Sequence, residues 1–165
     1  MRIATIVLIL AAVPCLAGDL ASFNFEGTRL GDTVKMFQQR HPEAKSQKVR
    51  PLFDAPPLVL HKVAVFQTGT GSARFTFYNG RLFRIALTYS QDTVNSLGGV
   101  VALHRKLEDR FGQTRNSIWR EGDLYLGGHI PSGGGWYMVI EDEAVMARMD
   151  RHNERQAKQQ TDPGF

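Results

Sequence analysis

Hydrophobic and polar residues alternate with a period of two on both sides of an Asn-Gly pair near the middle of the chain. The apolar positions of this pattern are Phe75, Phe77, Phe83, Ile85, Leu87 and Tyr89. Asn79-Gly80 suits a type I′ turn, in which both central residues take positive φ angles. Residues 73–89 are therefore predicted to form an antiparallel hairpin with one apolar face.

A strand before the hairpin and a helix after it extend this pattern. Valines share one side of residues 58–66, which predicts a third strand of a meander with its valine side facing inward. After the hairpin, Asp92 can cap a helix and Gly112 can end it. The apolar residues expected along this helix are Leu97, Val101, Leu103, Leu107 and Phe111.

The first third of the chain has weaker signals. Two phenylalanines alternate with polar neighbours over residues 20–26, which predicts a short strand. Asp32 is expected to cap a short helix that ends before Pro42. Prolines interrupt residues 42–57, and this stretch is predicted to be an irregular arm or an edge strand, because proline cannot donate to a sheet.

Four more strands are expected after the second helix. They are residues 116–120, 123–126, 136–140 and 144–149. A glycine-rich loop from Gly127 to Gly135 separates the two pairs, and the acidic run 141–143 is expected to form a turn. The whole order predicts an α+β fold, with an antiparallel sheet covered on one face by two helices. A helix followed by a meander occurs twice, so two tandem modules stay open beside one continuous sheet.

The N-terminus has the three parts of a secretory signal peptide. Met1-Arg2 precedes an apolar run of about a dozen residues, and small residues then lead to the polar Asp19. Cleavage is expected after Ala17, because a membrane anchor needs about 20 apolar residues. Lipidation of Cys15 is disfavoured, because Pro14 stands where that processing requires a small residue.

The expected organisation is a signal peptide over residues 1–17, a single α+β domain over 18–149 and a polar C-terminal tail over 150–165. The protein is then periplasmic or secreted, with no stable membrane span after cleavage. Because Cys15 is the one cysteine, export would leave no thiol for disulfides or metal binding. The net charge of +4 is modest and the basic residues are spread among acids, so no nucleic-acid partner is predicted.

Signals for catalysis are weak. No two of the five histidines lie three or four residues apart, as a zinc-binding helix requires, so neither a metal nor another cofactor is predicted. His104 is expected to border the helix core. Gly69-Thr70-Gly71-Ser72 lacks the lysine of a phosphate-binding loop and is predicted to be a hairpin loop. The carboxylates at 141–143 are expected to point apart into water, unlike the paired acids of a glycosidase.

A family resemblance rests on Leu30-Gly31-Asp32-Thr33-Val34, followed downstream by an aromatic strand and Asn79-Gly80-Arg81-Leu82. This layout resembles small bacterial envelope modules in which helices pack on an antiparallel sheet. Examples are the small lipoprotein of the outer-membrane assembly machinery and the tandem modules of the beta-lactamase inhibitory protein. The chain lacks the lipobox of the first and the disulfides of the second, so tethering and enzyme inhibition are not carried over. The resemblance implies a scaffold that binds proteins.

The expected function is a non-catalytic protein-binding module of the bacterial envelope, whose partner is another envelope or secreted protein. Tyrosine, tryptophan and arginine dominate protein interfaces. The candidate binding residues are Trp119, Tyr125, His129, Trp136, Tyr137, Arg81 and Arg84.

Two alternatives stay open. A small periplasmic hydrolase would use His129 with a carboxylate brought close by the fold. A carrier of small apolar ligands would need a cavity between helix and sheet. The residues expected to line that cavity are Phe75, Phe77, Ile85 and Leu107.

Overall fold

The computed structural model describes residues 19–46, 58–64 and 70–161, with the backbone alone described at 46, 58–64, 70, 153 and 156–161. The predicted signal peptide, the proline-rich arm over 47–57 and the loop residues 65–69 lie outside the described residues. The side chains of residues 58–66 are not described, so the prediction that their valines face inward stays a prediction.

The described strands form one antiparallel sheet in the order β1-β2-β3-β4-β7-β6-β5. The strands are β1 (Lys45–Ser46), β2 (Leu58–Ala64), β3 (Thr70–Tyr78), β4 (Arg81–Tyr89), β5 (Ile118–Glu121), β6 (Leu124–His129) and β7 (Trp136–Asp142). The meander β2-β3-β4 and the meander β5-β6-β7 meet where β4 pairs with β7. The predicted α+β class with an antiparallel sheet is confirmed, whereas an internal duplication stays a prediction.

The central hairpin forms as the alternating pattern predicts. Its turn residues Asn79 and Gly80 have φ angles of 49° and 72°, the positive values of a type I′ turn. Phe75 pairs with Ile85 and Phe77 pairs with Leu82, so the register shifts at a bulge whose extra residue is Phe83 of β4. The prediction for Phe83 was therefore wrong, because Leu82 takes the place in the core cluster that alternation assigned to Phe83.

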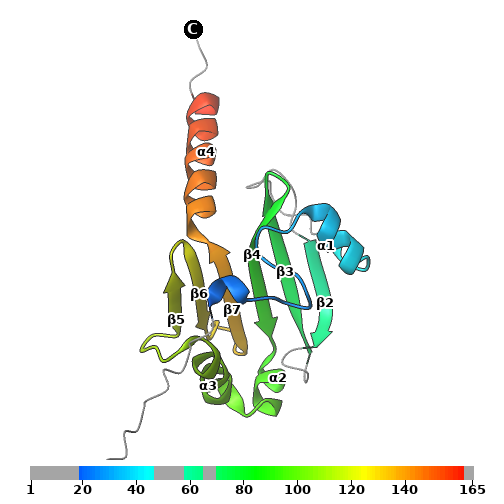
Figure 1. Ribbon diagram of the computed structural model, residues 1–165, viewed down its shortest axis with the longest axis vertical. Helices are drawn as coiled ribbons and strands as arrows, with labels where there is room; N and C mark the ends of the chain where they lie inside the picture. The colour runs from blue at the N-terminus through cyan, green and yellow to red at the C-terminus, as the bar shows by residue number, and fades with distance from the viewer. Residues whose placement is uncertain (1–18, 47–57, 65–69, 162–165) are drawn as a thin grey trace, which may run out of the picture.

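One face of the sheet is covered by short helices (Figure 1). These are η1 (Leu20–Ser22), α1 (Val34–Arg40), α2 (Gln91–Ser96) and α3 (Gly99–Phe111). Their buried side chains include Leu20, Phe37, Val94, Leu103, Leu107 and Phe111. The sheet contributes every second residue to the same cluster, including Phe75, Ile85, Leu87, Trp119, Leu126, Trp136 and Met138. We call this the covered face.

The predicted first strand was wrong. Residues 20–22 form η1, which Asp19 caps by accepting a hydrogen bond from the backbone of Ala21 at 2.7 Å. Phe23 and Phe25 are both buried in the core, as alternation with polar neighbours predicts, but the pairing of this segment is an isolated bridge between Phe25 and Thr28 and not a strand. Thr33, and not the predicted Asp32, is the N-cap of the next helix, because the Thr33 side chain accepts from the backbone N–H of Met36.

The predicted long helix is two helices. Ser90 caps α2 through its side chain, whereas the predicted cap Asp92 lies in the first turn of the helix. Gly98 and Gly99 then interrupt the helical path with φ angles of 91° and 83°. Val101 therefore lies outside the core and is 68% exposed. Gly112 ends α3 as predicted, with a φ angle of 88°.

The predicted last strand, residues 144–149, is the beginning of the long helix α4 (Glu143–Thr161). The Asp142 side chain accepts from the backbone N–H of Val145 at 2.9 Å, which is the geometry of a helix N-cap. Glu141 to Glu143 therefore do not form a turn. Three strands follow α3 instead of four.

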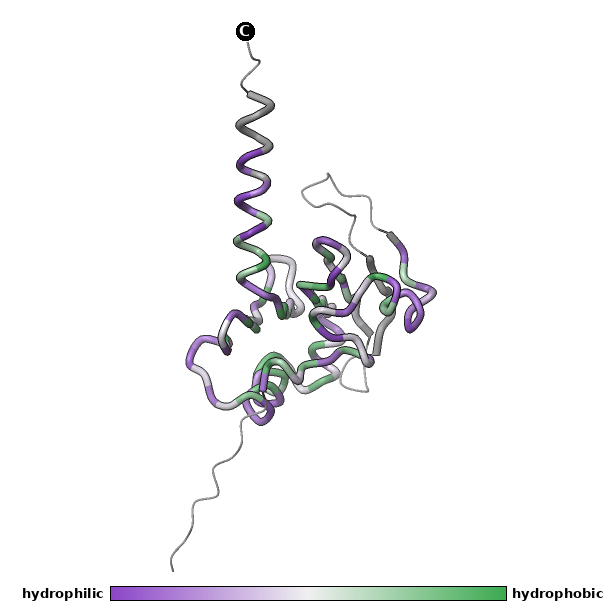
Figure 2. The backbone as a smooth tube through the Cα atoms, turned by 45° about the horizontal axis from the view of Figure 1, so that its top comes forward, coloured by the Kyte–Doolittle hydropathy of each residue, from purple (hydrophilic) through white to green (hydrophobic). Residues whose placement is uncertain are grey.

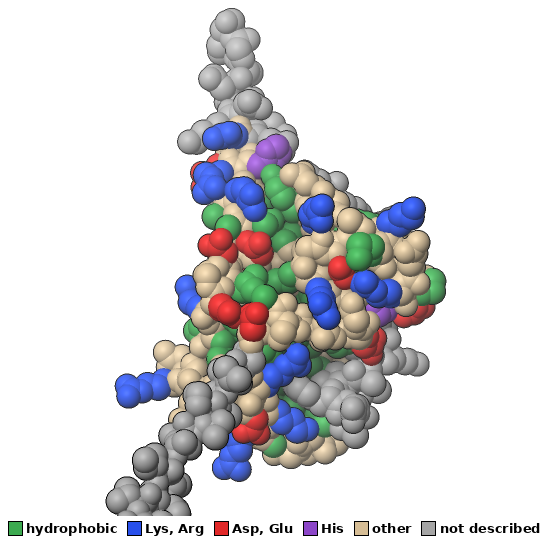
Figure 3. Space-filling view, viewed as in Figure 1, with side chains coloured by type: hydrophobic (Ala, Val, Ile, Leu, Met, Phe, Trp, Pro, Cys, Tyr) green, Lys and Arg blue, Asp and Glu red, His purple; other side chains and the backbone are tan. Residues whose placement is uncertain are grey.

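Helix α4 points away from the rest of the molecule (Figure 1). Hydrophobic residues lie near its start, and hydrophilic residues occupy its outer described turns (Figure 2). Acidic side chains gather around its base, whereas Lys and Arg side chains stand along it (Figure 3). Arg148, Arg151 and Arg155 are exposed there. No helix in the described part of the chain is long and apolar enough to cross a membrane.

Candidate functional site

The side of the sheet that faces away from the core carries a cluster of polar and aromatic side chains. The buried side chains of α1, α2 and α3 belong to the core cluster on the covered face. Strand residues that alternate with that core point to the other side, because neighbouring side chains of a strand alternate. We call this other side the open face. Its residues include Arg74, Arg84, Thr88, Arg120, Tyr125, His129, Tyr137 and Glu141.

The structure brings together four of the seven predicted binding residues. Tyr125, His129, Tyr137 and Arg84 share the open face on the adjacent strands β6, β7 and β4. Their strand pairing places His129 opposite Tyr137, with ring centroids 5.0 Å apart. These residues come from segments that are distant in the sequence, so the sheet alone assembles them.

The other three predicted residues lie elsewhere. Trp119 and Trp136 are 7% and 2% exposed and belong to the core. The Trp119 indole donates a hydrogen bond to the carbonyl of Gly112 at 2.7 Å. Arg81 is exposed at the tip of the hairpin, where its guanidinium donates to the carbonyl of Gly31.

Arg84 is the centre of the open-face cluster. Its guanidinium donates to the Tyr137 hydroxyl at 3.0 Å and lies 3.2 Å from a carboxylate oxygen of Glu141. The cross-strand pair Ala86 and Val139 lies between the pair Arg84 and Glu141 and the pair that contains Tyr137. Both Ala86 and Val139 are buried. The long side chains of Arg84 and Tyr137 thus lean toward one another over a small apolar floor.

Glu141 has an unusual environment for a carboxylate. Its Oε2 atom is buried and receives no hydrogen bond from the described residues, although Arg84 lies at ion-pair distance. Burial raises the pKa of Glu141, Arg84 acts in the opposite direction, and Glu143 adds to the increase. Burial of the ionised Glu141 carboxylate therefore costs desolvation free energy, which the ion pair with Arg84 offsets in part.

A second arginine-tyrosine pair extends the cluster toward the sheet edge. The Arg120 guanidinium lies 5.3 Å from the centroid of the Tyr125 ring and 3.1 Å from a carboxylate oxygen of Glu143. Gly127 lies under the Tyr125 side chain, and a Cβ atom at this position would overlap it. Gly127 and Gly128 belong to β6, and their lack of a side chain makes room for the rings of Tyr125 and Trp136. The glycine-rich loop is therefore shorter than the predicted range from Gly127 to Gly135.

The contacts of His104 and His129 do not give either histidine a catalytic arrangement. His104 lies between the Ser117 hydroxyl at 3.1 Å and a Glu108 carboxylate oxygen at 3.2 Å, and its ring lies against Trp119. His129 is exposed, and its neighbour is the Tyr137 ring. None of the ion pairs among the described residues involves His129. A histidine base needs a group that orients it, so this geometry gives the hydrolase alternative no support.

Metal chemistry also lacks a built site in the described part of the chain. No group of three or more His, Cys, Asp or Glu side chains there could hold a metal ion. What the open face offers is guanidinium, imidazole and phenol groups with a few carboxylates. Such groups recognise other molecules by hydrogen bonds and ring contacts.

Sequence reasoning missed Arg120 and Glu141 as members of this cluster. Arg120 lies one residue after Trp119, so alternation along a strand would have placed it on the face opposite the tryptophan. Glu141 was assigned to a turn because the helix start at Asp142 was not recognised.

No protein-family model matches the chain, and no curated protein sequence or solved structure is significantly similar to it.

Proposed function

We propose that this protein is an exported, non-catalytic binding module that contacts another envelope or secreted protein through the open face. The observation that carries the proposal is the assembly of Arg84, Arg120, Tyr125, His129 and Tyr137 on the face opposite the packed helices. Arginine and tyrosine are enriched where protein interfaces gain most of their binding energy.

The charges of the open face favour a particular partner chemistry. Arg74 and Arg120 are exposed there, and Arg84 is half-buried beside Glu141. The basic side chains outnumber the acidic ones on the open-face strands, so a partner segment with acidic and aromatic side chains suits the surface. Export rests on the predicted signal peptide and belongs to the same proposal.

Site-specific crosslinking in cells that express the protein tests the proposal. A photo-crosslinking residue replaces Thr88, which is exposed on the open face beside Tyr137. A matched control carries the same residue at Arg105, which is exposed on α3 on the covered side. We expect a discrete protein adduct from position 88 and none from position 105.

Two substitutions make the experiment specific. Tyr125→Ala and Arg120→Ala, combined in the Thr88 crosslinking variant, are expected to remove the adduct without unfolding the protein, because neither side chain is part of the core. Circular dichroism checks the fold. The proposal fails if position 88 yields no adduct, if position 105 yields the same one, or if the folded double variant retains it.

A further inference from the structure

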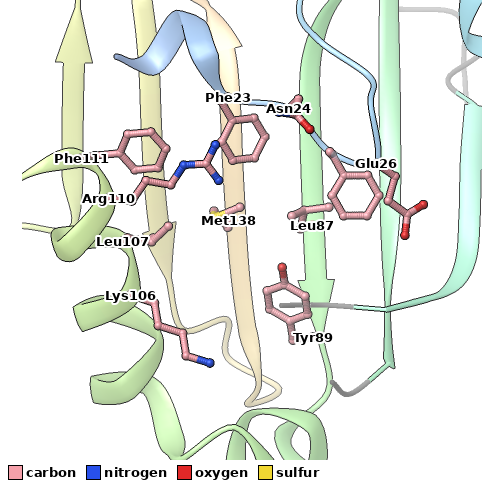
Figure 4. A pocket seen from close by; sticks show the side chains of 11 residues that line it. Phe23, Asn24, Glu26, Leu87, Tyr89, Lys106, Leu107, Arg110, Phe111 and Met138 are labelled. Carbon is pink, nitrogen blue, oxygen red and sulfur yellow. The ribbon is translucent and has the colours of Figure 1, made fainter. Parts of the chain in front are cut away.

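A pocket of about 190 Å³ opens on the covered face, on the other side of the sheet from the proposed protein-binding surface. It lies between α3, the segment around Phe23 and strands β4 and β7 (Figure 4). Its floor is apolar and is formed by Leu87, Leu107 and Met138. An apolar cavity of about 150 Å³ can hold a benzene ring, so this pocket has room for one ring or a short alkyl chain.

The charged groups at its rim are arranged asymmetrically. Lys106 and Arg110 extend from α3 toward the pocket, whereas Glu26 stands on the opposite side (Figure 4). The Arg110 guanidinium lies 5.7 Å from the Phe23 ring centroid and 5.1 Å from that of Phe111. Stacking on two rings fixes the plane of a guanidinium and leaves its N–H edge available.

Arg110 has no carboxylate partner within the described residues at ion-pair distance. Its contacts there are the two aromatic rings. A held guanidinium beside an apolar pocket suits the carboxylate of a ligand, because charge-assisted hydrogen bonds of this kind are strong and directional.

Tyr89 supplies a second polar group for a ligand. The residue as a whole is only 2% exposed. Its hydroxyl points into the pocket (Figure 4), and it is not among the buried polar atoms of the described residues that lack a partner, so it is open to the pocket. There it can donate a hydrogen bond to an oxygen of a ligand. Burial also raises the pKa of Tyr89 far above its usual range, so the hydroxyl remains a donor.

We propose that this pocket binds a small monocarboxylate with one aromatic ring or a short apolar chain. The apolar body rests on Leu87, Leu107 and Met138, and the carboxylate lies on the α3 side where Arg110 can reach it. The Tyr89 hydroxyl donates to an oxygen of the ligand. The site differs from the carrier cavity expected from the sequence. Of the four residues expected there, Leu107 lines the pocket, whereas Phe75, Phe77 and Ile85 are buried in the core and do not line it.

A titration of the purified protein, followed by two-dimensional NMR, tests the proposal with 3-phenylpropanoate as the probe. Few atoms are available for contact, so a dissociation constant of about 0.1–1 mM is expected. The shifted amides should belong to the pocket residues. The matched probes 3-phenylpropan-1-ol and 3-phenylpropylamine are expected to bind at least about tenfold more weakly, because each lacks the carboxylate.

Variants assign the roles of the side chains. Arg110→Gln is expected to weaken binding of 3-phenylpropanoate about tenfold, and Tyr89→Phe about fivefold. Glu26→Gln should strengthen it, because it removes a negative charge from the rim. Arg105→Gln is the matched control on the same helix and should change the constant less than twofold, since Arg105 does not line the pocket.

The proposal is overturned if no amide shifts appear up to about 10 mM 3-phenylpropanoate. It is also overturned if 3-phenylpropan-1-ol binds as well as 3-phenylpropanoate, or if Arg105→Gln weakens binding as much as Arg110→Gln. If Tyr89→Phe does not fold, Arg110→Gln and Glu26→Gln still decide, because both side chains lie at the rim. Since the pocket and the open face lie on opposite sides of the sheet, the crosslink at position 88 should persist in Arg110→Gln.

Discussion

Arg84 and Glu141 are direct partners across β4 and β7, with Arg84 Nε 3.2 Å from Glu141 Oε2. This pair lies at one end of the seam between the two meanders, and Tyr89 with Trp136 lies at the other. The arginine compensates only part of the cost of burying the carboxylate, because the net effect on the Glu141 pKa is an increase. The stability of the seam is therefore expected to depend on pH.

The stability difference between Glu141→Gln and the wild type should change with pH. A carboxyl group whose pKa is higher in the folded than in the unfolded state binds its proton more tightly when folded. Stability is then lost as the pH rises from about 4.5, the ordinary pKa of a glutamate, through the pKa of the folded state. Because glutamine cannot ionise, the stability of the variant relative to the wild type should increase as the pH rises above about 4.5.

Urea unfolding at several pH values measures this difference. Asp109→Asn, at an exposed acid on α3, controls for general charge effects. A difference between Glu141→Gln and the wild type that stays constant with pH would contradict the prediction.

Trp136 and Tyr137 are neighbours in β7 with opposite roles. Trp136→Ala is expected to reduce the free energy of unfolding by about 3–5 kcal/mol, because it leaves a cavity in the core. Tyr137→Ala removes a half-buried side chain from the open face and should cost less than about 2 kcal/mol. Denaturant unfolding compares the two variants. Equal losses would mean that the assignment of the two faces is wrong.

The glycine-rich loop before β7 contains one position that cannot accept a side chain. Gly135 has a φ angle of 83°, and a Cβ atom there would overlap the carbonyl oxygen of Tyr89. Its N–H donates to the Gln91 side chain at 2.8 Å. Gly135→Ala should therefore destabilise the protein by about 2 kcal/mol or more.

Gly133→Ala is the matched control for Gly135→Ala, because a Cβ atom there meets nothing within 4 Å. It should change stability by less than about 0.5 kcal/mol. Thermal unfolding measures both variants, and a similar loss from the two substitutions would contradict the assigned backbone geometry.

Helix α4 should not be uniformly stable. Met149 is 4% exposed, whereas Asp150, Arg151 and Arg155 are exposed. A helical segment without tertiary packing is only marginally stable in water. Hydrogen exchange should be fast for amides after Asp150 and slower for those of the first two turns. Uniform protection along α4 would show that its outer turns are held by other contacts.

The sequence was sufficient where one local signal determined the structure. The hairpin follows from alternation, which the bulge at Phe83 interrupts once, and from Asn79-Gly80, whose positive φ angles no ordinary pair adopts easily. The end of α3 at Gly112 follows from the same preference of glycine. In both cases the residues involved are neighbours in the chain.

The errors occurred where a short apolar run suits both a strand and a helix. Ala144 to Met149 has no clear period, and the N-cap at Asp142 decides for a helix. The break between α2 and α3 was visible as Gly98-Gly99, but helical spacing continued beyond it. Apolar spacing alone did not reveal that the chain changes direction there.

The candidate sites could be predicted only in part. Alternation places Tyr125 and His129 on one side of β6, but nothing in the sequence states that Arg84 lies two strands away. The pocket requires Tyr89 from β4, Arg110 from α3 and Phe23 from the segment after η1. Such a site is assembled by tertiary packing, so its residues have no regular spacing along the sequence that would predict it.

The seam between β4 and β7 also sets an order of events during folding. Within each meander the paired strands are close in sequence, whereas Tyr89 and Trp136 are about fifty residues apart, and closing a longer loop costs more chain entropy. Each meander is therefore expected to form before the two halves join. Substitutions at the seam should then speed unfolding more than they slow folding, because the seam closes late.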